Sequence, residues 1–255
     1  MANGKKAGTE VELATSSQFA ILEDSAAVVE LYQENMGDEQ INEFGLDRAK
    51  IPSGGATTWA IPSLDGEEET KEIVGIPLHW KTTRAYWAEA YSGGMTPPDC
   101  SSFDGKIGHG EFGVNSEKHP SGLCGDCPMS QFGTKIGPTG DLTDAPACQL
   151  RRPVFIARPD ELVPIVISLP PTSAGVWSAF SQRLLSKGKP FFSVVASFSL
   201  ERVSNKGGID YAKVVIRRVA NLDDGGIAAI RKLREQLVPA FDTAAKADSQ
   251  TQQAE

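Results

Sequence analysis

Four cysteines are the residues of this 255-residue chain whose spacing most clearly predicts chemistry. Cys124 and Cys127 form a C-x2-C pair in the Gly-rich stretch GLCGDCPMSQFGT, and Cys100 and Cys148 stand 24 residues before the pair and 21 after it. A C-x2-C turn brings two thiolates to one metal ion, and tetrahedral structural zinc takes four such ligands. The spacing therefore predicts a zinc site made by all four cysteines.

Several other interpretations of the cysteines stay open at this point. Four thiolates also hold an iron–sulfur cluster, and either His109 or His119 can replace Cys100 as a zinc ligand. Disulfides suit an oxidising compartment, and a redox C-x2-C pair suits a βαβ setting, which is absent here. A catalytic zinc needs an open position and a nearby acid or base, for which Glu111 and Asp126 are available.

The segment around the cysteines, 91–148, is crowded with Gly, Pro, Ser and Asp and contains few aliphatic residues. So long an insertion with so little apolar content cannot bury a core of its own. Metal binding supplies folding free energy on the order of 10 kcal/mol in such segments. The composition therefore favours a structural role for the predicted zinc.

Basic and aromatic residues are interleaved in WKTTRAYW, and further cations occur in RRPVF, KGKPFF and VIRR. Proteins that bind single strands combine a positive groove with aromatic platforms for the bases. Packing in a strand core is the alternative for the aromatic residues. The candidate DNA-binding residues are Trp80, Lys81, Arg84, Tyr86, Trp87, Arg151, Arg152, Lys187, Lys189, Arg217 and Arg218.

The net charge of -8 is unevenly distributed along the chain. Residues 1–75 carry a net charge of -10, residues 76–220 carry +4, and residues 221–255 carry -2. The basic candidates therefore fall in the one segment whose charge suits nucleic acid. No apolar run is long enough for a membrane span, and the N-terminus lacks the apolar region of a signal peptide, so we expect a cytoplasmic protein.

The pattern of elements predicts a mainly β, α+β fold. Two β-rich runs, ATTWAIP and KEIVGIPLHW, flank a charged turn and indicate a hairpin, and 153–158 and 163–169 are a second pair of strands. A helix capped by Thr172 or Ser173 follows, then two strands, FFSVVASFSLERV and IDYAKVVIRRV. A five-stranded barrel with a helix between its third and fourth strands is an OB-fold, here with a zinc-stabilised Cys-rich insertion and flanking helices.

These predictions divide the chain into consecutive regions. We expect a disordered N-terminal arm (1–16), an acidic helical region (17–50), an OB-fold-like DNA-binding domain (51–220) with its insertion at 91–148, a C-terminal helix (221–240) and a disordered tail (241–255). The acidic region is predicted to hold helices over 23–37 and 38–49.

A series of segments along 45–220 resembles a family of phage and mobile-element proteins described as single-stranded DNA-binding proteins. The segments are IPSGGATTWAIP, RAYW, PPDCSSFDGKIGHG, CGDCPMSQFGT, LPPTSAGVW and VVASFSLERVSNKGGIDYAKVVI, in the same order. An OB barrel with a zinc-bound insertion is also similar in plan to the helix-destabilising protein of T4-like phages. The zinc ligands of that family are one His and three Cys, whereas this chain offers four Cys. This chain also lacks the acidic C-terminal tail, ending in an aromatic residue, that many such proteins have.

The resemblance implies a non-catalytic protein that binds single-stranded DNA during phage or plasmid replication or recombination, in the cytoplasm of a bacterial host. Its expected partners are single-stranded DNA and replication or recombination proteins, and its expected cofactor is structural zinc. Two alternatives differ in class. One is a nucleic-acid-processing enzyme with zinc or an iron–sulfur cluster, and the other is a zinc-stabilised adaptor.

Overall fold

The computed structural model describes residues 13–14, 19, 30–31, 34–37, 45–89, 97–137, 139–159, 161–205 and 207–251. The predicted N-terminal arm and the two predicted N-terminal helices therefore lie largely outside the described residues. Two differences from the sequence-based prediction are visible there. Leu13–Ala14 (β1), in the predicted arm, pairs in parallel with Asn221 and Leu222, and Arg48–Ala49 (β2), at the end of the second predicted helix, is a strand.

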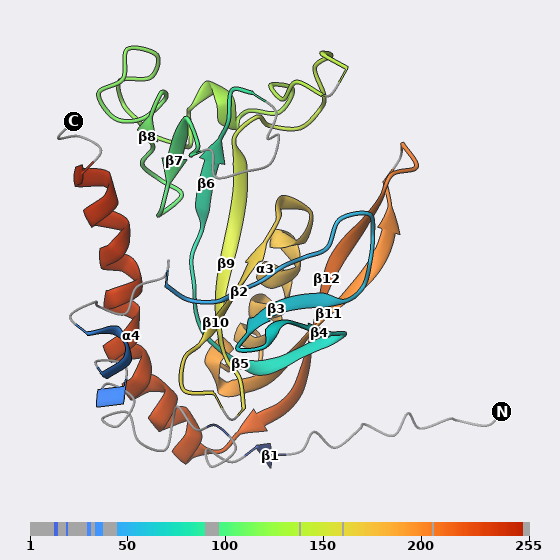
Figure 1. Ribbon diagram of the computed structural model, residues 1–255, viewed down its shortest axis with the longest axis vertical. Coiled ribbons are helices and arrows are strands. Elements are labelled where there is room, and N and C mark those ends of the chain that lie inside the picture. Colours follow the sequence, from blue (N-terminus) through green and yellow to red (C-terminus); the bar gives the residue numbers. More distant parts are fainter. Residues whose placement is uncertain are drawn as a thin grey trace.

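Five strands form the centre of the molecule and pair antiparallel in the order β10-β9-β5-β11-β12 (Figure 1). The bounds are Glu72–Trp80 for β5, Gln149–Ala157 for β9, Ile165–Leu169 for β10, Val194–Ser204 for β11 and Asp210–Leu222 for β12. Each strand lies where the β-rich runs of the sequence predict one. The mainly β, α+β class is therefore confirmed.

A hairpin of Trp59–Ser63 (β3) and Gly66–Thr70 (β4) lies beside this sheet. The predicted hairpin joined the run at β3 to the run at β5, with the charged residues as its turn. That pairing is wrong, because Glu67, Glu68 and Glu69 form β4 and leave their side chains in solvent. β2 pairs with β10, and an isolated bridge joins Lys50 to Ala60, so the sheet continues toward β3. The strand pairings of the described residues do not close a barrel.

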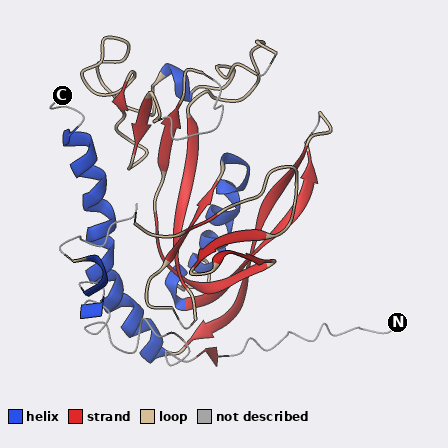
Figure 2. Ribbon diagram, viewed as in Figure 1, coloured by secondary structure: helices blue, strands red, loops and turns tan. Residues whose placement is uncertain are grey.

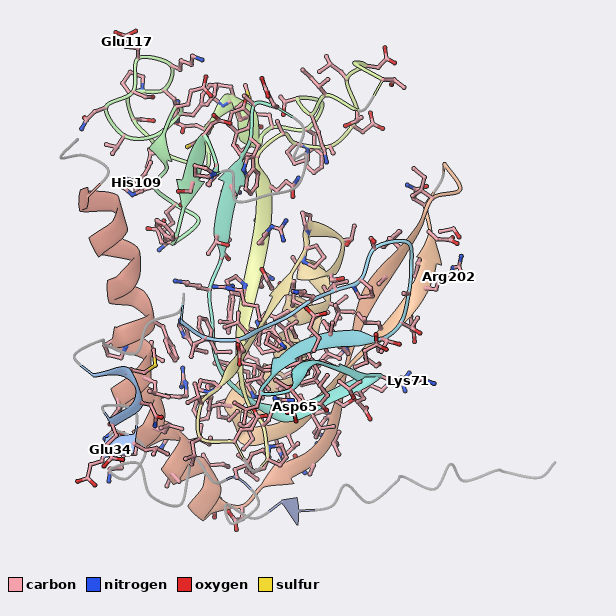
Figure 3. All side chains as sticks on the ribbon, in the orientation of Figure 1. Glu34, Asp65, Lys71, His109, Glu117 and Arg202 are labelled. Carbon is pink, nitrogen blue, oxygen red and sulfur yellow. The ribbon has the colours of Figure 1, made fainter. Side chains whose placement is uncertain are left out.

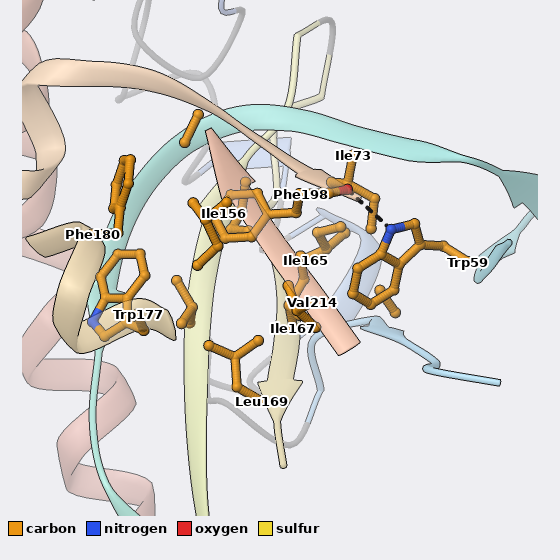
Figure 4. Close-up of a cluster of buried hydrophobic side chains, with 14 of the residues drawn as sticks. Trp59, Ile73, Ile156, Ile165, Ile167, Leu169, Trp177, Phe180, Phe198 and Val214 are labelled. Carbon is orange, nitrogen blue, oxygen red and sulfur yellow. Dashed lines mark hydrogen bonds between the residues drawn. The ribbon is translucent and has the colours of Figure 1, made fainter. Parts of the chain in front are cut away.

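The main core lies between the curved sheet, the β3 strand and one helix (Figure 4). Trp59 is completely buried, and its indole Nε1–H donates a hydrogen bond of 3.0 Å to the carbonyl oxygen of Phe198. This bond ties β3 beneath β11, two strands that do not pair with each other. A buried Trp needs such a partner because an unpaired buried N–H is costly.

The helix α3, Pro171–Leu185, connects β10 to β11 as predicted and covers the core with Trp177, Phe180 and Leu184. Its predicted cap is wrong. The helix begins after Pro170 without a side-chain cap, and the hydroxyl of Ser173 instead accepts a hydrogen bond of 3.1 Å from the backbone N–H of Val214. Ser173 therefore joins the helix to β12.

The C-terminal helix α4, Asp224–Thr251, is longer than predicted and includes residues assigned to a disordered tail. It continues past Pro239, and Phe241 is fully buried with its ring stacked 4.6 Å from the ring of Phe155 on β9. The apolar contact at Phe241 explains why the helix does not end at the proline. None of the described helices combines the length and apolar character that a membrane crossing needs.

The described part of the predicted insertion, residues 97–137 and 139–148, is called the cysteine segment below. It stands at one end of the molecule, apart from the main core, and is mostly loop (Figures 1 and 2). Its short strands Cys100–Ser102 (β7) and His109–Gly110 (β8) pair with each other, and β7 pairs with Thr83–Tyr86 (β6). Since β6 also pairs with β9, these two strands carry the segment.

Candidate metal and nucleic-acid site

Strands β6 and β9 have two different faces because side chains alternate along a strand. Directly opposite residues of an antiparallel pair share a face. Tyr86 lies opposite Cys100, and Arg84 lies opposite Ser102, so these side chains share one face. Ala85 lies opposite Gln149 and Thr83 opposite Arg151 on the other face. The first is called the cysteine face below, and the second, Thr83, Ala85, Gln149 and Arg151, the outer strip.

The four cysteines are brought together on the cysteine face. All four are buried free thiols, and they line one cavity of about 10 Å³ together with Arg84, Tyr86 and Phe112. A cavity of this size holds a single small ion or one water molecule. Four cysteines that are far apart in the sequence therefore line the same small cavity.

Tight backbone turns position the cysteines. The N–H of Cys124 donates to the carbonyl of Lys106 at 2.8 Å, and the N–H of Cys148 donates to that of Met129 at 2.8 Å. Gly122 has a φ of +62°, and a Cβ atom there would come within 2.4 Å of the backbone nitrogen of Val114. Only glycine fits this position, because both the dihedral angle and the close approach exclude a side chain.

Burial shifts the titration of the thiols. It raises the pKa of Cys148 to about 11 and raises the pKa values of Cys100 and Cys124. At Cys100, hydrogen bonds from the backbone N–H groups of Phe112 and His109 partly offset the rise in pKa that burial causes. Without a further cation, such thiols stay protonated at neutral pH, whereas a bound metal ion deprotonates coordinating thiols outright.

Arg84 supplies positive charge to this cluster. It lines the cavity, and its charge lowers the pKa of both Cys124 and Cys148, although burial outweighs it. Its Nε is buried and has no hydrogen-bond partner in the described part of the chain. Arg84 is a candidate DNA contact from the sequence, but the structure places it against the thiols.

The four thiols are not arranged with the geometry of a metal site in this structure. Within the described residues, no group of three or more His, Cys, Asp or Glu side chains is arranged to hold a metal ion. Neither His109 nor His119 lines the cavity. The Nε2 of His119 lies 3.0 Å from the Leu123 carbonyl oxygen and 3.2 Å from a carboxylate oxygen of Asp126. Asp126 thus contacts the histidine.

The outer strip carries an available cation. Arg151 forms no ion pair with any described residue and lies opposite Thr83, at the end of the strip nearer the main core. Lys81 precedes the strip, and its Nζ donates to the carbonyl oxygen of Phe241 at 3.4 Å. Trp87 follows at the other end. Tyr86 belongs to the cysteine face, where it packs edge-on against Phe112 with ring centroids 5.4 Å apart.

Arg152 and Trp80 lie away from the outer strip. The guanidinium of Arg152 lies over the Trp80 ring, and its Nη1 donates to the carbonyl oxygen of Ala174 on α3 at 2.8 Å. Burial lowers the pKa of Arg152, although an arginine stays charged. Trp80 in turn packs against Trp177, with ring centroids 6.2 Å apart. Trp80 is therefore a packing residue between the sheet and α3, which is the alternative to DNA binding that the sequence left open.

The remaining basic candidates lie on other elements. Lys189 and Arg218 both donate to the side-chain oxygen of Asn221, at 2.9 Å and 3.1 Å, so two cations converge on a neutral acceptor. Arg217 is exposed and lies 3.9 Å from Glu201, and Lys187 is exposed after the end of α3. Figure 3 shows how far the β11–β12 hairpin, marked by Arg202, stands from His109 and Glu117 on the cysteine segment. The structure therefore divides the basic candidates into separate groups.

Sequence analysis did not find Thr83 and Gln149 of the outer strip or the exposed apolar residues Phe132, Ile136 and Leu142 of the cysteine segment. The alternation of side chains along TTRAYW and QLRRPV places every second residue on the same face of its strand. The strip can be predicted from it only when the pairing of β6 with β9 is known, because the register decides which residues of the two strands share a face.

A scan against protein-family models and searches among curated proteins and solved structures found no match to this chain.

Proposed function

We propose that this protein is a non-catalytic single-stranded DNA-binding protein that acts in phage or plasmid replication or recombination in the bacterial cytoplasm. The outer strip of β6 and β9 contacts the strand. The cysteine segment, ordered by one structural zinc ion, shapes one end of the binding surface. Replication or recombination proteins are the expected partners.

The strand pairings support an OB-fold origin for the core. In an OB-fold the first strand pairs with the second and the fourth, the second also with the third, and the fourth with the fifth. β5, β9, β10, β11 and β12, taken in that order, make these pairings, and α3 occupies the place of the OB helix. The further pairing that closes an OB barrel, between the third and fifth strands, is replaced by β2 and β3 beside β10.

The position of the outer strip is the observation that carries the proposal. OB-folds bind nucleic acid on the face of their second and third strands and with the loop between the first and second strands. In this chain β9 stands for the second strand, and the cysteine segment forms part of the connection between β5 and β9. Arg151 on β9 and the cysteine segment between β5 and β9 therefore correspond to the second strand and to the first loop of an OB-fold, which supports the outer strip as the contact surface.

Zinc is supported by the donor chemistry of the cavity. Four thiols line a space for one small ion, backbone N–H groups donate to the sulfur of Cys100, and the partly buried Arg84 offsets negative charge. Four thiolates and a zinc ion carry a net charge of minus two, which an adjacent guanidinium partly neutralises. Cys100, Cys124, Cys127 and Cys148 would hold the ion, and its contribution is to fold the segment.

A fluorescence anisotropy titration tests the function. We expect the purified protein to bind a labelled oligo-dT and to bind a duplex of equal length much more weakly at the same salt concentration. The logarithm of affinity should fall linearly with the logarithm of salt, with a slope of about -0.7 per neutralised phosphate. Equal affinity for single strand and duplex at low salt would contradict the proposal, as would turnover of either substrate.

A further inference from the structure

A pocket of about 620 Å³ opens beside the outer strip. Tyr86 and Trp87 line it at the end of β6, and Gln149 lines it from β9. A hairpin of the cysteine segment, in which Ile136 and Leu142 form a bridge, also lines it. Its volume falls within the range of small-molecule binding sites.

The hairpin wall presents apolar side chains to solvent. Ile136 and Leu142 are 62% and 70% exposed, although both line a hollow. Backbone hydrogen bonds of 3.0 Å from Lys135 N to Ala145 O and of 2.8 Å from Thr143 N to Lys135 O hold the hairpin. Apolar side chains kept in a concave, solvent-filled site are typical of a surface that a ligand covers.

Two polar side chains at the pocket are available to a ligand. The amide of Gln149 makes no hydrogen bond to a described residue, and Lys135 makes no ion pair with one. An amide matches the donor and acceptor pattern of a base edge, and an ammonium group matches a phosphate. Gln149 and Arg151 are two residues apart on one face of β9, so the pocket continues the outer strip.

We propose that this pocket takes one unstacked base of the bound single strand, with Trp87 as its stacking platform and the Ile136–Leu142 wall on its other side. The inference rests on the proposed function and adds to it a reason for strand selectivity. A base in a duplex is paired and stacked, and it cannot enter a pocket of this kind without leaving the helix. The pocket therefore favours a single strand beyond what charge alone provides.

Anisotropy titrations with two probes test the pocket. One probe is oligo-dT, and the other is an oligonucleotide of equal length made only of abasic sites, which keeps the phosphates and lacks the bases. We expect the wild type to bind oligo-dT at least roughly fivefold more tightly than the abasic probe, the lower end of the effect of one stacked base. Trp87→Ala and Leu142→Ser should each remove most of this difference and leave affinity for the abasic probe unchanged.

Leu64→Ala is the matched control, because Leu64 is a fully exposed apolar residue in the turn between β3 and β4. It should leave both affinities unchanged. Urea unfolding of each variant identifies loss of structure, and the exposed Leu142 provides a decisive variant if Trp87→Ala does not fold.

The outcomes separate the two proposals. If the wild type binds neither probe, the proposed function fails. If the wild type prefers oligo-dT and both Trp87→Ala and Leu142→Ser keep that preference, the base pocket is wrong while the function stands. Equal wild-type affinity for the two probes would also overturn the pocket, since phosphate contacts alone would then explain binding. Loss of a protein partner by Leu142→Ser with unchanged oligo-dT affinity would assign the pocket to a peptide instead.

Discussion

The guanidinium carbon of Arg152 lies 5.1 Å from the centroid of the Trp80 ring, on the face of β9 that packs against α3. Arg151, the preceding residue, belongs to the opposite face and forms no ion pair with a described residue. Two adjacent arginines thus have different roles. Arg152 joins the sheet to the helix, and Arg151 is available to a phosphate.

Replacing Arg152 should therefore reduce stability more than DNA binding. Arg152→Met removes the cation–π contact with Trp80 and the hydrogen bond to the Ala174 carbonyl. We expect the free energy of unfolding to fall by about 1–2 kcal/mol, from the usual contributions of such contacts. Urea unfolding measures it. Unchanged stability together with a large loss of oligo-dT affinity would assign Arg152 to the DNA surface instead.

Replacing Arg151 should have the opposite effect. Arg151→Met removes one cation from the outer strip without breaking an ion pair among the described residues. We expect stability to change by less than about 0.5 kcal/mol, as for ordinary surface substitutions. Affinity for oligo-dT should decrease, and the salt slope should become shallower by about 0.7, which is one phosphate contact. An unchanged slope would show that Arg151 meets no phosphate.

The fold was predictable where local pattern and burial agree. β5, β9, β10 and α3 lie where their runs predict them, because the apolar strand residues and the helical spacing of Val176, Phe180 and Leu184 match the final core. Leu185, which the same spacing places on the apolar face, is exposed. The convergence of the cysteines was predictable for a similar reason. A segment that buries few apolar side chains has few other ways to become ordered.

Contacts between residues far apart in the sequence determine the elements that were not predicted correctly. Three consecutive glutamates indicate a turn, yet pairing with β3 makes them a strand with exposed side chains. A bulge at Val219 leaves Arg217, Arg218 and Val219 all exposed, so the regular alternation of buried and less buried side chains along β12 ends at Ile216. The two faces of β6 and β9 likewise depend on a register that sequence alone does not specify.

Phe241 provides a test of the extended C-terminal helix. The sequence predicts a disordered tail over 241–255, whereas the structure buries the Phe241 ring against Phe155. Phe241→Ala should lower the free energy of unfolding by about 3–5 kcal/mol, as for other buried phenylalanines. The control is Leu185→Ala, which removes a side chain that is 73% exposed and should change stability by less than about 0.5 kcal/mol. Equal stability of the two variants in urea would favour the disordered tail.

Asp210 gives the β11–β12 hairpin a dependence on pH. Hydrogen bonds from the Ser204 hydroxyl and the Arg202 guanidinium hold the pKa of Asp210 below its usual 3.8. Since the pKa is lower in the folded state, the stabilisation is fully present above about pH 3.8 and is lost as pH falls through the folded-state pKa. Carboxyl-carbon NMR should give a midpoint below 3.8, and Ser204→Ala should move it upward. A midpoint at or above 3.8 in the wild type would show that these hydrogen bonds do not form in solution.

Removal of the metal should unfold the cysteine segment while the main core stays folded. The segment contributes none of the residues of the main core around Trp59 and Trp177, and its own buried groups are chiefly the four thiols. The zinc-loaded protein should contain one zinc per chain by elemental analysis, and Cys148→Ser should contain much less. After chelation, hydrogen exchange should speed up at the amides of Cys124 and Cys148, which donate to Lys106 and Met129, while β11 amides stay protected.

The amides of Cys124 and Cys148 also distinguish a metal site from a metal-free thiol core. Buried protonated thiols pack as small apolar groups, so a metal-free core would keep both amides protected in the presence of a chelator. In a zinc centre, chelation removes the ion that holds the four thiolates together, so the segment loses that folding free energy and both amides lose protection. Protein purified without metal whose amides stay protected would therefore contradict the zinc site. The outer strip depends on the pairing of β6 with β9 and not on the metal. Its role in DNA binding would then still be tested by the DNA titrations.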